Sequence, residues 1–138
     1  MSADAKRVAA AEAALEAETP TRRLSLAEAQ RFVDHVTHAE DFDPPLVVSR
    51  KVRAKVDGLA VGDAHAIVVA STTPSELTLL HELAHFIGGM DHGPRFREVY
   101  VGLVDKHLSS KCSSHLQSSL NATDRSSVLL ENLNNLNE

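Results

Sequence analysis

Residues 73–96 read TPSELTLLHELAHFIGGMDHGPRF, and this stretch decides the fold. Thr73 and Glu76 have the spacing of a capping box at the start of a helix. The apolar residues that follow cover most of the circumference of a helix, so we expect this helix to be buried. Gly88-Gly89 should end the helix, and Pro94 suits the first turn of another one. The stretch therefore predicts a buried helix, a short turn and a second helix.

The buried helix contains the motif His81-Glu82-Leu83-Ala84-His85, which is an HExxH. Residues four apart lie one turn apart on the same helix face, so both imidazoles can reach one tetrahedral zinc ion. Glu82 is offset along the turn and can take a proton from a zinc-activated water without binding the metal. A buried segment that carries three ionisable groups needs partners for them, and a metal ion explains all three.

Two adjacent residues can supply the third protein ligand, Asp91 and His92. The spacing from the HExxH to Asp91 is similar to an extended pattern of some metzincins, in which Asp replaces the third His. Metzincins also have a Met-turn downstream of the motif, whereas the only methionines here are Met1 and Met90. Because neither methionine lies beyond the ligands, we favour His92 as the third ligand. Asp91 can still orient a ligand histidine without binding the metal itself.

Residues 92–96 read HGPRF, which resembles the HGxxF signature of SprT-like zinc metallopeptidases. The resemblance extends over residues 65–108 and includes small SprT-like metallohydrolases of actinobacteria and their phages. It implies a minimal zincin-like, gluzincin-related domain whose third histidine opens the second helix, with Phe96 packed inward. The implied Zn²⁺ ligands are His81, His85 and His92, and the implied catalytic residue is Glu82.

The motif and the resemblance together predict a zinc metallopeptidase that hydrolyses peptide bonds with Glu82 as general base. Similar enzymes hold an extended peptide against a sheet edge, and by analogy residues 66–70 would form that edge. One alternative is a zinc hydrolase of a non-peptide amide. Another is a catalytically silent, zinc-stabilised binding module, although a closed structural site has four protein ligands and no use for a base beside the metal.

The remaining sequence predicts a single α+β domain over residues 1–108. We expect N-terminal helices within 4–38, a small three-stranded antiparallel sheet within 46–70, and the active-site helices within 74–108. A capping box at Ser25–Glu28 should start the second helix. Turns are expected at Asp57-Gly58 and Gly62-Asp63. Residues 109–138 are rich in Ser, Asn and Leu and should form a polar, loosely held tail.

The composition of the chain limits the kinds of partner that we expect it to bind. The net charge of −5 disfavours a nucleic-acid-binding surface, and we interpret the basic residues Arg50, Lys51, Arg53 and Lys55 as the solvated face of a strand. The lone Cys112 excludes an internal disulfide and a Cys-rich zinc finger. No stretch is long and apolar enough to cross a membrane, so we expect a cytoplasmic protein. Tyr100 should be a core residue rather than an oxyanion donor.

Overall fold

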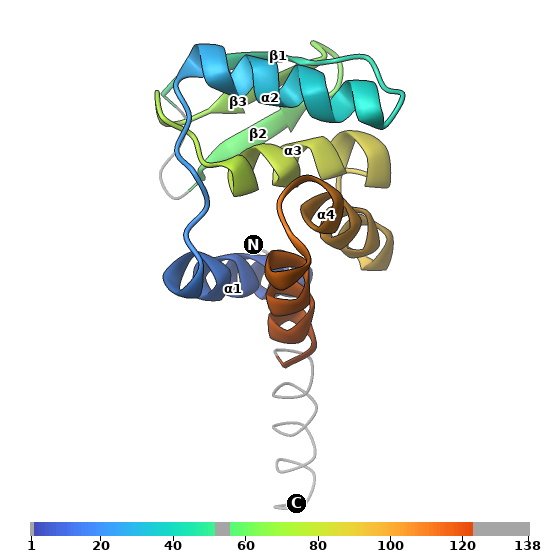
Figure 1. Cartoon of the computed structure of the whole chain (residues 1–138). Coiled ribbons are helices and arrows are strands. Elements are labelled where there is room, and N and C mark those ends of the chain that lie inside the picture. The colour runs from blue at the N-terminus through green and yellow to red at the C-terminus, as the bar shows by residue number, and fades with distance from the viewer. Residues whose placement is uncertain (1, 52–55, 123–138) are drawn as a thin grey trace, which may run out of the picture.

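The computed structural model describes residues 2–51 and 56–122 and confirms an α+β fold. The named helices are α1 (Ala3–Glu18), α2 (Leu26–Ala39), α3 (Glu76–Gly88) and α4 (Pro94–His107). The strands are β1 (Leu46–Ser49), β2 (Gly58–Val61) and β3 (Ala66–Val69). Residues 110–122 form a fifth helix (Figure 1). Within the described ranges, no helix combines the length and the hydropathy needed to cross a bilayer.

The sheet is mixed, so the prediction of a purely antiparallel sheet was wrong. Its order is β1-β3-β2, with β1 parallel and β2 antiparallel to the central β3. A period of two residues marks strands but does not say which strands pair or in which direction. The turn predicted at Gly62-Asp63 does join β2 to β3. The basic strand predicted around residues 52–55 lies outside the described residues.

The pair Asp57-Gly58 was expected to form a hairpin turn, but Gly58 is the first residue of β2. A Cβ atom at Gly58 would lie 3.2 Å from Glu82 Oε2 and 3.3 Å from Glu82 Cγ. Glycine therefore suits the close approach of α3 to the strand, and an Asp-Gly pair in the sequence does not distinguish this role from a hairpin turn.

The helix α3 lies between the sheet and α4, with α2 also packed against it (Figure 1). Its N-cap is Ser75, whose hydroxyl accepts a hydrogen bond from the Thr78 amide, so the cap lies two residues after the predicted one at Thr73. The capping box at Ser25–Glu28 is confirmed at the start of α2. At the far end of α3, a Cβ on Gly88 would lie 3.1 Å from Phe96 Cα, so α3 and α4 cross almost in backbone contact.

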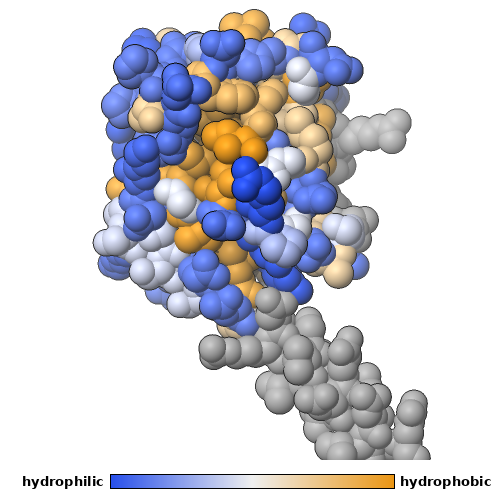
Figure 2. Space-filling model, turned by 90° about the vertical axis from the view of Figure 1, so that its right-hand side faces the viewer, coloured by the Kyte–Doolittle hydropathy of each residue, from blue (hydrophilic) through white to orange (hydrophobic). Residues whose placement is uncertain are grey.

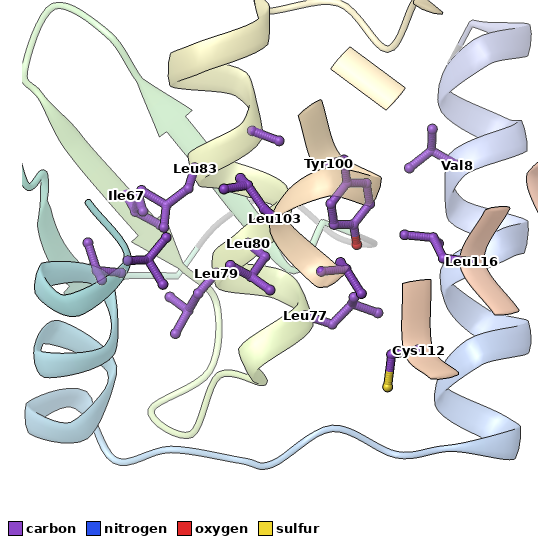
Figure 3. Close-up of a cluster of buried hydrophobic side chains, with 14 of the residues drawn as sticks. Val8, Ile67, Leu77, Leu79, Leu80, Leu83, Tyr100, Leu103, Cys112 and Leu116 are labelled. Atoms are coloured by element: carbon purple, nitrogen blue, oxygen red, sulfur yellow. The ribbon is translucent and has the colours of Figure 1, made fainter. Parts of the chain in front are cut away.

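The C-terminal segment is more firmly packed than we predicted, as far as the structure describes it. Cys112, Leu116 and Leu120, on the helix of residues 110–122, are buried and belong to the main hydrophobic core. Figure 3 shows Leu116 and Cys112 close to α1, with Val8 of α1 near Leu116. The expectation of a loose tail is therefore wrong for residues 110–122, and residues 123–138 lie outside the described part.

The core is mostly aliphatic, although its two largest fully buried side chains are the aromatic Tyr100 and Phe96, and hydrophobic residues at its edge reach the surface. On the face drawn in Figure 2, apolar residues gather in the middle and hydrophilic residues surround them. Several hydrophobic residues that pack against the core are only partly buried, among them Phe86, Ile87 and Val99.

Candidate metal centre

The three predicted histidine ligands come together at one point. His81 and His85 lie one turn apart on α3, and His92 lies in the short turn before α4. The Nε2 atom of His92 is 3.2 Å from that of His85 and 3.3 Å from that of His81. Nitrogen ligands placed 2.0–2.1 Å from a tetrahedral ion are roughly 3.3–3.4 Å apart. The spacing of these atoms therefore fits one metal ion held by three imidazoles.

The opposite ring nitrogens of two ligands are held by acceptors. His81 Nδ1 lies 2.6 Å from Glu12 Oε2, and His85 Nδ1 lies 2.9 Å from the carbonyl oxygen of Gly89. A carboxylate or carbonyl oxygen can only accept, so each Nδ1 carries the proton and donates it. This leaves the Nε2 lone pairs of His81 and His85 available to a metal ion.

The sequence did not reveal Glu12, because this residue lies on α1, 69 residues before its partner His81. One signal was present. Val8 and Leu15 are buried on α1, and Glu12 is four residues after the first and three before the second. It therefore occupies the inward face of that helix, where an unpaired carboxylate would be costly.

Phe96, the aromatic residue of HGPRF, forms the floor beneath the ligands. It is fully buried, as predicted, and its ring stacks on His85 with centroids 4.4 Å apart. Its centroid lies 5.0 Å from that of His92 and 5.1 Å from that of His81. The phenylalanine thus limits the ring orientations of all three histidines by packing.

The turn that carries His92 is fixed by two further contacts. Asp91 Oδ1 accepts a hydrogen bond from the Gly93 amide at 3.1 Å, and the aspartate side chain is not part of the histidine cluster. Arg97 donates to the His92 carbonyl oxygen at 2.9 Å and to Asp4 of α1 at 3.1 Å. Asp91 therefore shapes the turn, and the metzincin-like placement of a third ligand at Asp91 finds no support in the geometry.

Glu82 is buried, with only 5% of its surface exposed to solvent. Burial raises its pKa to about 7, and the nearby charges of Glu12 and Asp57 act in the same direction. The charge of His81 and a hydrogen bond from the Ala60 backbone act in the opposite direction. A carboxyl group with a pKa near 7 can accept and release a proton at neutral pH.

The histidines differ in their affinity for protons. Burial lowers the pKa of His85 to about 4 and also lowers that of His92, so both rings stay neutral near neutral pH. Burial opposes protonation of His81 as well, but the hydrogen bond to Glu12 and its charge outweigh this effect and raise the pKa. His85 and His92 are therefore neutral nitrogen donors that suit a divalent cation, whereas the raised pKa of His81 means that a metal ion must compete with a proton for its Nε2.

A cleft of about 530 Å³ opens at the three histidines. One wall is β2, through Gly58, Leu59 and Ala60, and α1 contributes Ala5, Ala9 and Glu12. Tyr100 does not line it: the residue is fully buried, which confirms that it is a core residue, and its hydroxyl donates to Glu12 at 2.6 Å.

Among the residues that the structure describes, His81, His85 and His92 are the group that can hold a metal ion. Of the basic residues considered for nucleic acid, Arg50 and Lys51 are exposed, and Arg53 and Lys55 lie outside the described part. Comparisons with models of protein families, with curated proteins and with solved structures found no match.

Proposed function

We propose that this protein is a zinc-dependent metallopeptidase, similar to the SprT-like enzymes, that hydrolyses peptide bonds. The observation that carries the proposal is the convergence of three Nε2 atoms, 3.2–3.3 Å apart along the two measured pairs, beside a buried carboxyl group. Zinc suits three imidazoles, and three protein ligands are typical of catalytic zinc, whereas structural zinc has four. When bound, the ion would polarise a carbonyl group and lower the pKa of a water molecule.

The proposed role of Glu82 follows from its position and its pKa. Its carboxyl group lies between the ligand helix and β2, at the wall of the cleft. Since its pKa is raised to about 7, it can take a proton from the attacking water and return it to the leaving amine. A binding module has no need of this group, and a buried carboxyl lowers stability wherever it is ionised.

The sheet edge beside the site belongs to β2 and not to residues 66–70. The strand β3 is central and is paired on both sides, so it cannot receive a peptide. The carbonyl of Asp57 accepts a hydrogen bond from the Ala70 amide. Because such hydrogen bonds alternate along an antiparallel pair, the register of β2 and β3 turns the peptide groups of Gly58 and Ala60 away from β3. Among the described residues, no strand pairs with this outer edge of β2. The Ala60 backbone makes a hydrogen bond with Glu82, so a substrate in extended conformation can add to the edge at Gly58.

The length of the cleft favours a peptide over a small amide. A second cavity of about 320 Å³ shares Ala9, Glu12, Asp57 and Thr78 with the cleft at the histidines. The two cavities therefore adjoin at these residues, beside α1. Such a groove accommodates several residues of an extended chain, which a small amide would not fill.

The metal is tested first, by measuring the zinc content of the purified protein by mass spectrometry. We expect about one zinc per chain in the wild type and in Asp91→Ala, and loss of zinc in His92→Ala. Zinc that is retained without His92 but lost without Asp91 would contradict the proposed ligand set.

The reaction is tested with an unbiased peptide library and a matched set of small amides. Glu82→Gln should keep its zinc and lose peptide cleavage by about 10²–10⁴-fold. Glu98→Gln, the same change at an exposed position on α4, should cleave like the wild type. Cleavage of the small amides alone would favour the non-peptide hydrolase. Equal behaviour of wild type and Glu82→Gln on every substrate would favour the silent binding module.

A further inference from the structure

We propose that Glu12 of α1 is a positioning residue for His81 and makes the N-terminal helix part of the metal centre. The proposal rests on the metal centre described above and adds a residue that lies far from the HExxH helix in sequence. Glu12 does not touch the metal position. It acts through the ring of His81, by fixing which nitrogen carries the proton and which way the ring faces.

The geometry joins three helices at one oxygen atom. Glu12 Oε2 accepts from His81 Nδ1 of α3 at 2.6 Å and from the hydroxyl of Tyr100 of α4 at 2.6 Å. Tyr100 is fully buried, so its hydroxyl cannot follow the carboxylate elsewhere. The second hydrogen bond therefore restrains the carboxylate that in turn restrains the ligand ring. A charged acceptor also makes the imidazole a stronger metal ligand.

Docking of α1 does not by itself explain a glutamate at this position. The helix already buries Val8, Ala11 and Leu15 in the main core. An apolar residue between them would extend the same stripe without the cost of desolvating a carboxylate. The two hydrogen bonds that Glu12 accepts explain why a glutamate is present, and one of the two donors, His81, is a predicted metal ligand.

The neighbouring residue Glu16 provides a matched control. It lies one turn further along α1 and accepts hydrogen bonds from the amide and the hydroxyl of Thr21, at 2.9 and 2.6 Å. Like Glu12, it ties α1 to another part of the chain through a carboxylate. Unlike Glu12, it has no contact with a histidine of the centre.

The experiment measures zinc affinity in the full chain by competition with a chromophoric chelator, for wild type, Glu12→Ala, Glu12→Gln and Glu16→Ala. We expect Glu12→Ala to bind zinc about 10–100-fold more weakly, the usual cost of losing such a partner. Glu12→Gln should lie between, because its amide oxygen accepts the same hydrogen bonds without the charge. Glu16→Ala should bind as the wild type does. Circular dichroism of the metal-free proteins shows which variants are folded.

A wild-type affinity in either folded Glu12 variant would overturn the proposal, as would an equal loss in Glu16→Ala. If Glu12→Ala does not fold, Glu12→Gln decides by the same criterion. If neither variant folds without metal, Glu12 is a structural residue and the proposal fails. Absence of zinc binding in the wild type would be a different result, because it would remove the metal centre itself.

Discussion

Two clusters of histidine and glutamate stand in different parts of the molecule and differ in how their polar atoms are satisfied. In the first, His81 donates to Glu12 at 2.6 Å, and its Nε2 faces two other ligand nitrogens. In the second, between α2 and α4, the ring of His107 lies edge-on to His35 with centroids 6.2 Å apart. Glu40 lies beside it, with Oε1 3.6 Å from His107 Nε2, which is too long for a hydrogen bond.

The difference shows that composition alone does not make a site. His107 Nε2 is the one buried side-chain nitrogen or oxygen without a hydrogen-bond partner in the part of the chain that the structure describes. In the metal centre, by contrast, acceptors hold His81 and His85 so that their Nε2 atoms converge with His92. A cluster that directs several donors to one point can bind an ion, whereas a single orphaned nitrogen only lowers stability.

The largest expected effect separates the two clusters by metal binding. His85→Ala removes a ligand and should weaken zinc binding by more than the roughly 100-fold that loss of an outer partner can cost. His107→Ala removes a histidine whose side chain is only 5% exposed but converges with no other donor, and should leave zinc affinity unchanged. Chelator competition measures both. Comparable losses in the two variants would show that zinc is held elsewhere or is not held at a defined site.

The part of the centre that the sequence could predict is the part that is local. His81 and His85 are four residues apart, and helix geometry alone places them together. His92 follows in the next turn, where a glycine and a proline mark the start of another helix. Glu12 is brought in from α1 by tertiary packing, so its contact with His81 could not be read from spacing, although its place on an apolar helix face was a usable signal.

The fold is likewise divided between local features, which the sequence predicts, and long-range features, which it does not. The helices with strong caps and stripes were predictable, but the direction and order of strand pairing depend on contacts distant in sequence. The dipeptide Asp57-Gly58 is typical of a turn, yet here the glycine begins β2 and leaves room for the close approach of Glu82. In the last helix, Cys112, Leu116 and Leu120 repeat every four residues, a stripe that the abundance of serine and asparagine obscured.

The second prediction concerns the buried carboxyl group of the centre in the metal-free protein. Burial raises the pKa of Glu82 from its ordinary value of 4.5 to about 7, so the folded state holds a proton that the unfolded chain has released. The free energy of unfolding therefore falls as pH rises between these values. Glu82→Gln cannot ionise, and near pH 8 it should be more stable than the wild type by roughly 3 kcal/mol, a gain that vanishes below pH 4.5.

Urea denaturation at a series of pH values, with a chelator present, measures this difference. Glu98→Gln changes the same functional group at an exposed position and controls for the substitution itself. A gain for Glu82→Gln that does not change with pH would mean that the buried carboxyl ionises as readily as an exposed one. The proposed role of Glu82 as a base near neutral pH would then lose its support.

The smallest expected effect lies in the second cluster. His107→Leu removes the orphaned nitrogen and should raise the free energy of unfolding by about 1 kcal/mol at neutral pH. Burial lowers the pKa of His107, so the wild type loses stability as pH falls below the value of an unfolded histidine, and the advantage of leucine should grow there. A loss of stability in His107→Leu at neutral pH would mean that Glu40 and His107 form a stabilising pair in solution, and the two clusters would then differ in the convergence of their nitrogens alone.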